Sequence, residues 1–151
     1  MLHVVLFQPE IPHNTGAIGR LCLASGARLH LIHPLGFSLN DKYLRRSGLD
    51  YWEQVDVQEW DSWNALRGSA AEGSTFFFVE CEGGKTYWEA PLMSEEIYLV
   101  FGPETRSIPP SIIDAERCLK IPMCEGGTRS LNLATAAAIV LYEAVRQRTV
   151  S

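Results

Sequence analysis

Compact apolar runs alternate with helix-like stretches along the whole chain, and this alternation limits the possible folds more than any other feature of the sequence. The runs at residues 75–80 and 97–101 combine β-branched and aromatic residues, as buried central strands do. Further strands are predicted at residues 3–7, 29–33, 54–57 and 119–121. The alternation predicts an α/β fold in which a mostly parallel sheet carries helices on both faces.

Four helices are predicted between and after these strands. The first covers residues 15–25, with Asn14 or Thr15 as its cap and Gly26 as its stop. Asp41 caps a short helix that runs to residue 47, and Asp61 caps another that runs to residue 67. The last helix covers residues 131–148, and its first half is apolar or small on nearly every face. We therefore expect this helix to be covered on several sides.

The length and composition fit one globular domain over residues 1–151. Hydrophobic residues make up 46% of the chain and charged residues 21%, which is ordinary for a soluble protein. No apolar run reaches the roughly 18–20 residues that span a bilayer, and Gln8, Pro9 and Glu10 interrupt the first one. That first run is therefore predicted to be a strand, not a signal peptide. The four cysteines form no CxxC pair, and we expect a protein of the reducing cytoplasm.

The histidines offer little as metal ligands. His30 and His33 lie three residues apart on a predicted strand, so their side chains should point to opposite faces. We expect no metal site.

The net charge of −5 argues, taken alone, against a nucleic-acid partner. The distribution of charge matters more than the sum, however. Lys42, Arg45 and Arg46 share one face of the short predicted helix, and Tyr43, Tyr51 and Trp52 lie close to them in sequence. Cations beside aromatic rings suit single-stranded RNA. A solvated helix face would explain the same residues.

Ligands of parallel α/β sheets bind beyond the carboxyl ends of the strands, and three loops follow strands here. The first, residues 8–20, contains Gly16 and Gly19 but neither GxGxxG nor the Lys-Ser/Thr ending of a phosphate loop. A plain turn closed by two prolines explains most of its residues. It does not explain Arg20, which lies one helical turn in and is expected to reach back over the strand ends.

The second loop, Phe101-Gly-Pro-Glu-Thr-Arg106, directly follows a buried strand. Gly102 allows a ligand or another backbone to approach closely, although a surface turn with a charge pair is the simpler interpretation. The third loop, residues 121–132, enters the last helix, where backbone amides bind anions. Arg129 opposes the helix dipole at that place, which indicates a phosphate or an acidic partner.

Together the three loops resemble the three motifs of the SPOUT class of RNA methyltransferases, and within it the small tRNA wobble-position 2′-O-methyltransferases (the TrmL group). The matching stretches are PxIPxNTGxIxRLC, FGPETR, and IPM followed by RSLNL; the run LRRSGLDYW adds to them. The resemblance covers almost the whole chain. It implies a carboxyl-terminal trefoil knot, a homodimer that completes the active site from both subunits, and S-adenosylmethionine as cofactor. It also implies tRNA as substrate, expected to be a leucine tRNA, with methyl transfer to the ribose of cytidine or uridine 34.

The resemblance also implies roles for individual residues. Asn14, Arg20 and Arg129 match the positions that face the RNA and the transferred methyl group, and Lys42, Arg45 and Arg46 are the expected RNA-binding cations. The expected cofactor-binding residues are Val79, Gly102, Ile121, Met123 and Ser130. Residues 125–127, Glu-Gly-Gly, replace a more usual Pro-Asp pair, so the third loop departs from the pattern of the group.

Arg20 stays protonated and is a poor base, so we expect it to orient the 2′-hydroxyl and to neutralise phosphate, with Asn14 fixing Arg20 or the ribose. Three alternatives remain open: the same chemistry on ribosomal RNA, a non-catalytic RNA-binding module, and an unrelated nucleotide-binding α/β enzyme.

Overall fold

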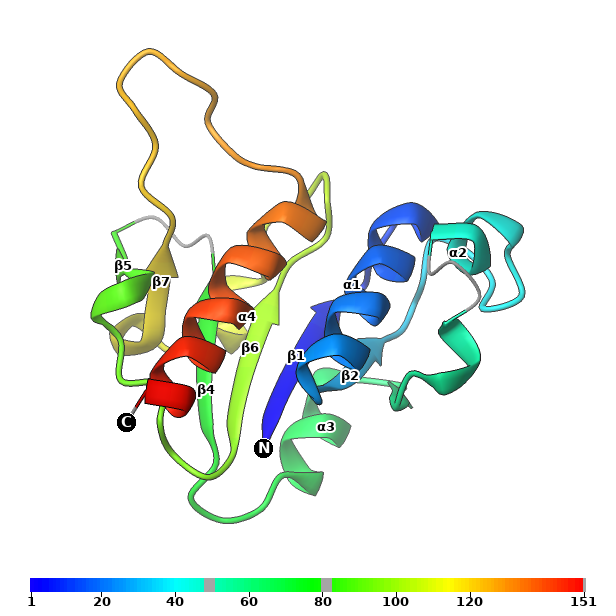
Figure 1. Cartoon of the computed structure of the whole chain (residues 1–151), viewed down its shortest axis with the longest axis horizontal. Coiled ribbons are helices and arrows are strands. Elements are labelled where there is room, and N and C mark those ends of the chain that lie inside the picture. The colour runs from blue at the N-terminus through cyan, green and yellow to red at the C-terminus, as the bar shows by residue number, and fades with distance from the viewer. Residues whose placement is uncertain (48–50, 80–82, 151) are drawn as a thin grey trace.

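A computed structural model describes residues 1–47, 51–79 and 83–150. In this part of the chain seven strands form one sheet in the order β3–β2–β1–β6–β4–β7–β5, and every neighbouring pair is parallel (Figure 1). The α/β class with a parallel sheet is therefore confirmed. The strands are β1 (Leu2–Phe7), β2 (Arg28–Ile32), β3 (Val57–Trp60), β4 (Thr75–Val79), β5 (Lys85–Thr86), β6 (Ile97–Phe101) and β7 (Cys118–Lys120).

Helices cover both faces of the sheet, as expected. They are α1 (Pro12–Ser25), α2 (Lys42–Ser47), α3 (Trp63–Ser69) and α4 (Leu133–Val150), with short 3-10 turns η1 (Trp52–Gln54), η2 (Tyr87–Glu89), η3 (Pro110–Ile112) and η4 (Ala115–Arg117). No helix in the described residues is long and apolar enough to cross a membrane.

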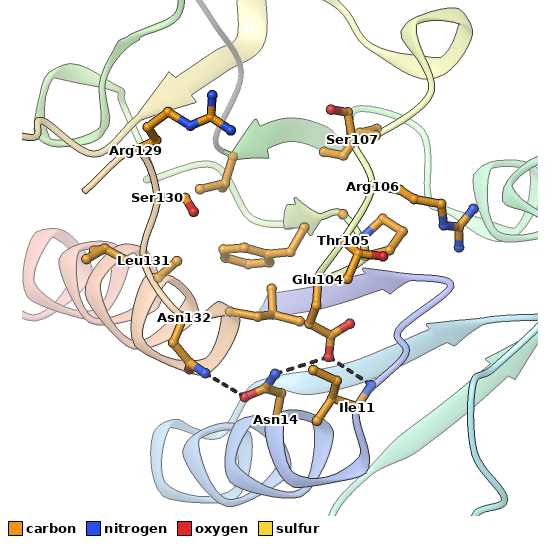
Figure 2. Close-up of a pocket in the computed structure, with 17 residues that line it drawn as sticks. Ile11, Asn14, Glu104, Thr105, Arg106, Ser107, Arg129, Ser130, Leu131 and Asn132 are labelled. Atoms are coloured by element: carbon orange, nitrogen blue, oxygen red, sulfur yellow. Dashed lines mark hydrogen bonds between the residues drawn. The ribbon is translucent and has the colours of Figure 1, made fainter.

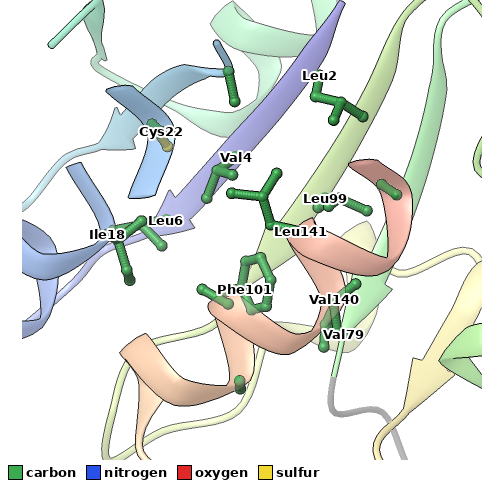
Figure 3. Packing of buried hydrophobic residues seen from close by; sticks show 14 of the residues in the cluster. Leu2, Val4, Leu6, Ile18, Cys22, Val79, Leu99, Phe101, Val140 and Leu141 are labelled. Atoms are coloured by element: carbon green, nitrogen blue, oxygen red, sulfur yellow. The ribbon is translucent and has the colours of Figure 1, made fainter. Parts of the chain in front are cut away.

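The two hydrophobic cores follow the alternation of side chains along the strands. Val4 and Leu6 of β1 point to the face covered by α1 and α4, where they meet Ile18 and Leu141 (Figure 3). Val5 and Phe7 point to the opposite core, which includes Leu66 of α3. Because β1 is buried on both faces, all six of its residues are apolar or, at His3, paired.

Several predicted element ends are wrong. Helix α1 begins at Pro12, where proline suits the first helical position, and neither Asn14 nor Thr15 caps it. Gly26 does end α1, in the left-handed conformation with φ of 77°. In α3 the cap is Ser62, not Asp61, because the Ser62 hydroxyl accepts a hydrogen bond from the Ala65 backbone N–H.

The strand predicted at residues 54–57 is displaced along the chain. Trp52–Gln54 form η1 instead, and β3 starts only at Val57. Strand β3 lies at the sheet edge and is half-exposed, so its hydrophobic pattern is weak. Strands β1, β2, β4, β6 and β7 lie within one residue of their expected ends, with the sixth residue of the 75–80 prediction outside the described residues, whereas the two-residue edge strand β5 was not predicted.

A chain of hydrogen bonds, buried at its two histidines, crosses the face of the sheet that α3 covers. The Trp60 indole N–H donates to His30 Nδ1 over 2.9 Å, and His30 Nε2 lies 2.9 Å from His3 Nδ1. His3 Nε2 lies 3.3 Å from a Glu96 carboxylate oxygen. An indole N–H can only donate, so His30 accepts at Nδ1 and must donate from Nε2 to His3 Nδ1, and His3 donates from Nε2 to Glu96. Each imidazole then carries one proton and is neutral. Burial lowers the pKa of His30 to about 3, and it also lowers the pKa of His3.

His30 and His33 therefore have different hydrogen-bond partners. His33 follows β2 and pairs with Glu59 over 2.8 Å. Among the described residues no group of three or more His, Cys, Asp or Glu side chains could hold a metal ion.

The sheet order brings the three loops of interest together. Strands β2 and β3 extend the sheet on one side of β1, whereas all later strands lie on its other side. The side on which successive strands join the sheet thus reverses between β1 and β6. Ligands of parallel α/β sheets bind at the carboxyl ends of the strands at such a reversal. The first loop follows β1, the second follows β6, and the third follows β7 two strands further along.

Candidate functional site

A cleft of about 580 Å³ lies at these carboxyl ends (Figure 2). Ile11 and Asn14 line it from the start of α1, residues 101–108 from the second loop, and residues 129–133 with Ala136 from the third loop and α4. Val79 contributes the end of β4. Each of the three loops therefore supplies part of one cavity.

Two carboxylates hold the first and second loops together reciprocally. The Glu104 carboxylate accepts hydrogen bonds from the backbone N–H groups of Glu10 and Ile11, over 2.8 and 2.9 Å. In return the Glu10 carboxylate accepts from the Thr105 backbone N–H and from its hydroxyl, both over 2.8 Å. The two bonds from Thr105 lower the pKa of Glu10. We call this arrangement the carboxylate clasp.

The clasp also explains how α1 starts without a local cap. The amides that Glu104 binds are those at and before the N-cap Ile11, and a negative charge at this end complements the helix dipole. The capping carboxylate comes from more than 90 residues along the chain, with a sequence separation of 94 for Glu10. No pattern near Asn14 could have revealed it.

Asn14 links the clasp to the last helix. Its amide nitrogen donates to Glu104 over 3.1 Å, and its amide oxygen accepts from the Asn132 side chain over 3.0 Å (Figure 2). The Asn132 side-chain oxygen in turn accepts from the backbone N–H groups of Ala134 and Thr135. Asn132 is therefore the cap of α4, and the path Glu104–Asn14–Asn132 connects all three loops.

This geometry corrects the expected contact of Asn14. Its amide contacts Glu104 and Asn132 and not Arg20, so within the chain Asn14 does not fix Arg20. Asn14 still lines the cleft. The sequence places Glu104 in the second loop and Asn132 at the end of the third but does not reveal the links between them, and it gives no role in the site to Glu10. Glu104 and Asn132 are close to Asn14 only in the folded chain, so no pattern in the sequence could reveal these contacts.

Arg106 also lines the cleft, and its guanidinium points away from the opposite wall formed by Arg129 and Ser130 (Figure 2). Its guanidinium donates to the Gln8 side chain over 3.2 Å and lies 3.6 Å from the Glu10 carboxylate. Gln8 is the non-glycine residue with a positive φ, 49°, in the described residues. Strained backbone of this kind is tolerated where surrounding contacts fix it; here Gln8 donates its backbone N–H to the Ile32 carbonyl and accepts from Arg106 through its side chain.

A second cavity, of about 1200 Å³, adjoins the first. Ile121 and Met123 line it together with Lys120, and it shares Ser107, Ile108, Arg129 and Ser130 with the first cavity. The expected cofactor residues are thus divided: Val79 and Gly102 line the first cavity, Ile121 and Met123 the second, and Ser130 both. Arg129 is exposed at their junction.

Gly102 has a structural reason to be glycine. A Cβ atom built there would lie 2.9 Å from Ile108 Cγ1 and 3.1 Å from the Ile108 backbone nitrogen. The close approach expected at this position is therefore made by the second loop folding back on itself.

Arg20 does not reach back over the strand ends, contrary to expectation. It is exposed on α1 and lines neither cavity. Six residues separate it from Asn14, which corresponds to about 240° of rotation and about 9 Å along a helix. Its guanidinium instead lies over the Tyr51 ring, 5.4 Å from the ring centroid.

The three expected RNA-binding cations lie on α2, away from the two cavities. Lys42 and Arg46 are exposed, with the Lys42 ammonium 5.1 Å from the Tyr43 ring centroid. Arg45 forms an ion pair with Glu53. Of the neighbouring aromatic residues, Tyr43 and Tyr51 are exposed, whereas Trp52 is buried and cannot stack on a base.

A parallel α/β sheet with a cleft built by loops at its reversal point defines an enzyme-like α/β ligand-binding domain. The chain matches the SpoU rRNA Methylase family over residues 1–142, and it belongs to that family. It is 45% identical over 150 residues to the tRNA (cytidine(34)-2′-O)-methyltransferase of Escherichia coli strain K12, with 97% of this chain and 94% of that relative covered.

Solved structures agree. A structure described as giving insights into the 2-OH methylation of C/U34 on tRNA shares 47% identity with this chain and superposes with a TM-score of 0.90, covering 99% of this chain and 97% of that one. The SpoU methyltransferase AviRb from Streptomyces viridochromogenes, in complex with AdoMet, shares 26% identity with a TM-score of 0.85, covering 100% and 62%.

Proposed function

We propose that this chain transfers a methyl group from S-adenosylmethionine to the ribose 2′-hydroxyl of nucleotide 34, cytidine or uridine, of a tRNA. The observation that carries the proposal is the full-length similarity to cytidine-34 enzymes in a chain whose three matching motifs form one cleft. A leucine tRNA is the substrate we would test first.

The two adjoining cavities fit the cofactor in size and in chemistry. Ile121, Met123 and Ile108 offer an apolar surface for the adenosine, while Ser130 and the polar groups beyond it suit the methionine part. Val79 and Gly102 complete the floor. When bound, S-adenosylmethionine supplies an electrophilic methyl group, and the protein contributes alignment and the handling of the 2′-hydroxyl proton.

The residues proposed to bind and orient the RNA are cationic. Arg129, at the junction of the cavities, is placed to neutralise an RNA phosphate beside the reacting ribose. Arg20 orients the 2′-hydroxyl without acting as a base, since a guanidinium remains protonated. Lys42, Arg45 and Arg46 supply salt-dependent affinity; Arg46 has the largest part because Glu53 already pairs with Arg45.

We further propose that two copies of the chain complete each site. Arg20 faces away from the cleft of its own chain, so in a homodimer it would serve the cleft of the partner. The outer surface of α4 supports such an interface: Tyr142 is 41% exposed and Ile139 is only half-buried. Helix α1 lies beside α4 on the same side of the sheet (Figure 1), so Arg20 and this surface can belong to one interface.

Three further expectations, about the knot, the domain and the compartment, belong to the same proposal. The segment from β7 through α4 would form the trefoil knot of the SPOUT class, residues 1–151 would form a single methyltransferase domain, and the protein would act in the cytoplasm on tRNA. The single sheet and its likeness to SpoU structures support the first two, and the tRNA substrate supports the third.

Ribosomal RNA is the second candidate substrate, because the family description names rRNA. The closer similarity to cytidine-34 enzymes favours tRNA. Incubation of the purified protein with S-adenosylmethionine and total RNA from cells that lack the gene separates the two. We expect one new 2′-O-methyl group at tRNA nucleotide 34; methylation of rRNA alone, or binding without methylation, would contradict the proposal.

A further inference from the structure

Arg20 and Tyr51 form one of two consecutive contacts between α1 and the segment that ends in η1. The Arg20 guanidinium lies over the Tyr51 ring at 5.4 Å. In the preceding pair, Gly19 packs on the Trp52 ring so closely that a Cβ atom on Gly19 would lie 2.7 Å from it. Neighbouring residues of α1 thus contact neighbouring residues of the other segment.

The contact between Gly19 and Trp52 fixes the neighbouring Tyr51 relative to α1. Trp52 is only 8% exposed and belongs to the core beneath α1. The Tyr51 carbonyl also accepts a hydrogen bond from the Gln54 backbone N–H over 2.9 Å. The position of the Tyr51 backbone is therefore determined by buried packing, although the residue as a whole is 40% exposed.

A fixed ring limits the conformations of a long side chain. An exposed arginine ordinarily occupies many rotamers and loses that freedom when it must hold one geometry. A guanidinium over an aromatic face is attracted by the ring quadrupole while its N–H groups remain available at the edge. Within the described residues no carboxylate pairs with Arg20, so the aromatic face is the contact that orients it.

We propose that Tyr51 is a positioning residue that holds the Arg20 guanidinium ready for the ribose of the substrate RNA. This inference rests on the proposed function, since Arg20 acts on a ribose only there. It assigns the role to the aromatic ring and not to the phenolic hydroxyl.

The test compares Tyr51→Phe, Tyr51→Leu, Arg20→Ala and the double variant Tyr51→Leu/Arg20→Ala. Single-turnover methylation at saturating tRNA reports the chemical step, and filter binding reports tRNA affinity. Tyr51→Phe should keep the rate within about two-fold, whereas Tyr51→Leu should lower it about 5- to 30-fold, which is what loss of a partly desolvated cation–π contact corresponds to. The double variant should be no slower than Arg20→Ala, because Tyr51 acts through Arg20.

Arg67→Ala is the matched control, since the exposed Arg67 guanidinium also lies over an aromatic ring, that of Phe76 at 4.2 Å, but on α3 and outside both cavities. It should leave both tRNA binding and the single-turnover rate unchanged. A wild-type rate for Tyr51→Leu, or multiplicative losses in the double variant, would overturn the inference while wild-type methylation at nucleotide 34 still supports the proposed function. Absence of any methylation by the wild-type protein would instead contradict the proposed function itself.

Discussion

The side-chain amide of Asn132 makes two different connections. Its oxygen caps α4 by accepting from Ala134 and Thr135, and its nitrogen donates to Asn14. Aspartate keeps the first connection but has no N–H for the second, and it is as good a cap as asparagine. The two connections can therefore be separated by substitution.

Asn132→Asp should leave the free energy of unfolding nearly unchanged and reduce single-turnover methylation, because the link from α4 to the carboxylate clasp is lost. Asn132→Ala loses the cap as well and should cost about 1 kcal/mol of stability. Urea denaturation and the methylation assay provide the two measurements. If Asn132→Asp methylates at the wild-type rate, the link between the loops does not contribute to the reaction.

At this scale the sequence indicated the right loops but not the right partners. Asn14, Gly102, Arg129 and Ser130 all line the first cavity, as their place after strands predicts. The contacts of Asn14 depend on Glu104 and Asn132, which lie 90 and 118 residues away. Such distances carry no local pattern, so the contacts had to come from the fold.

Among the elements, the helix and strand interiors were predictable and their ends were less so. Strand β6 has its predicted bounds because it is central and buried on both faces. Helix α1 begins three residues early because Pro12 opens it and a distant carboxylate satisfies its first amides. Strand β3 is displaced because it is a half-exposed edge strand.

The packing of α1 against η1 gives a prediction for Gly19. Alanine usually stabilises a helix interior by up to about 1 kcal/mol relative to glycine, but here its Cβ would meet the buried Trp52 ring. We expect Gly19→Ala to lower the free energy of unfolding by about 1–3 kcal/mol, as overpacking does. Gly68→Ala in α3 is the control, since nothing lies within 4 Å of its Cβ position, and it should be neutral or stabilising. Equal effects of the two substitutions in urea denaturation would disprove the tight contact.

The buried histidine chain that links β1, β2 and β3 predicts a loss of stability in acid. The unfolded chain protonates His30 as the pH falls below its ordinary pKa of 6.5, whereas the folded chain does so only near pH 3. Between these values acid favours the unfolded state, so the stability present above pH 6.5 is progressively lost. From His30 alone we expect a decrease of about 2 kcal/mol between pH 7.5 and pH 5.

His30→Gln tests this expectation, since a glutamine amide can accept from Trp60 and donate to His3 without titrating. The free energy of unfolding, measured by denaturant titration at both pH values, should depend less on pH than in the wild type. An unchanged pH dependence would place the acid-sensitive group elsewhere.

For the whole molecule, the position of Arg20 predicts that active sites are shared between two chains. Arg20→Ala should slow methylation by about 10²-fold or more, as loss of an orienting group does. Gly102→Val should block the cofactor cleft, because Gly102 already touches Ile108. In the proposed homodimer, a mixture of the two variants would form heterodimers in which one site combines an intact Arg20 with an intact cleft from the other chain. Such a mixture should regain about a quarter of the wild-type activity.

If Arg20 serves the cleft of its own chain, the mixed dimers contain no complete site and no activity returns. Light scattering on the wild type provides the independent control. It should show a particle of twice 16.9 kDa, and a monomer that still methylates tRNA would contradict the shared site.

The most direct measurement of the central claim uses two tRNA molecules that differ by a single oxygen atom. One carries a ribose at nucleotide 34 and the other a 2′-deoxyribose at the same position, with all other nucleotides and modifications identical. Transfer of the labelled methyl group from S-adenosylmethionine should occur to the first tRNA and not to the second. Equal labelling of the two would show that the methyl group goes to another atom and would contradict the account.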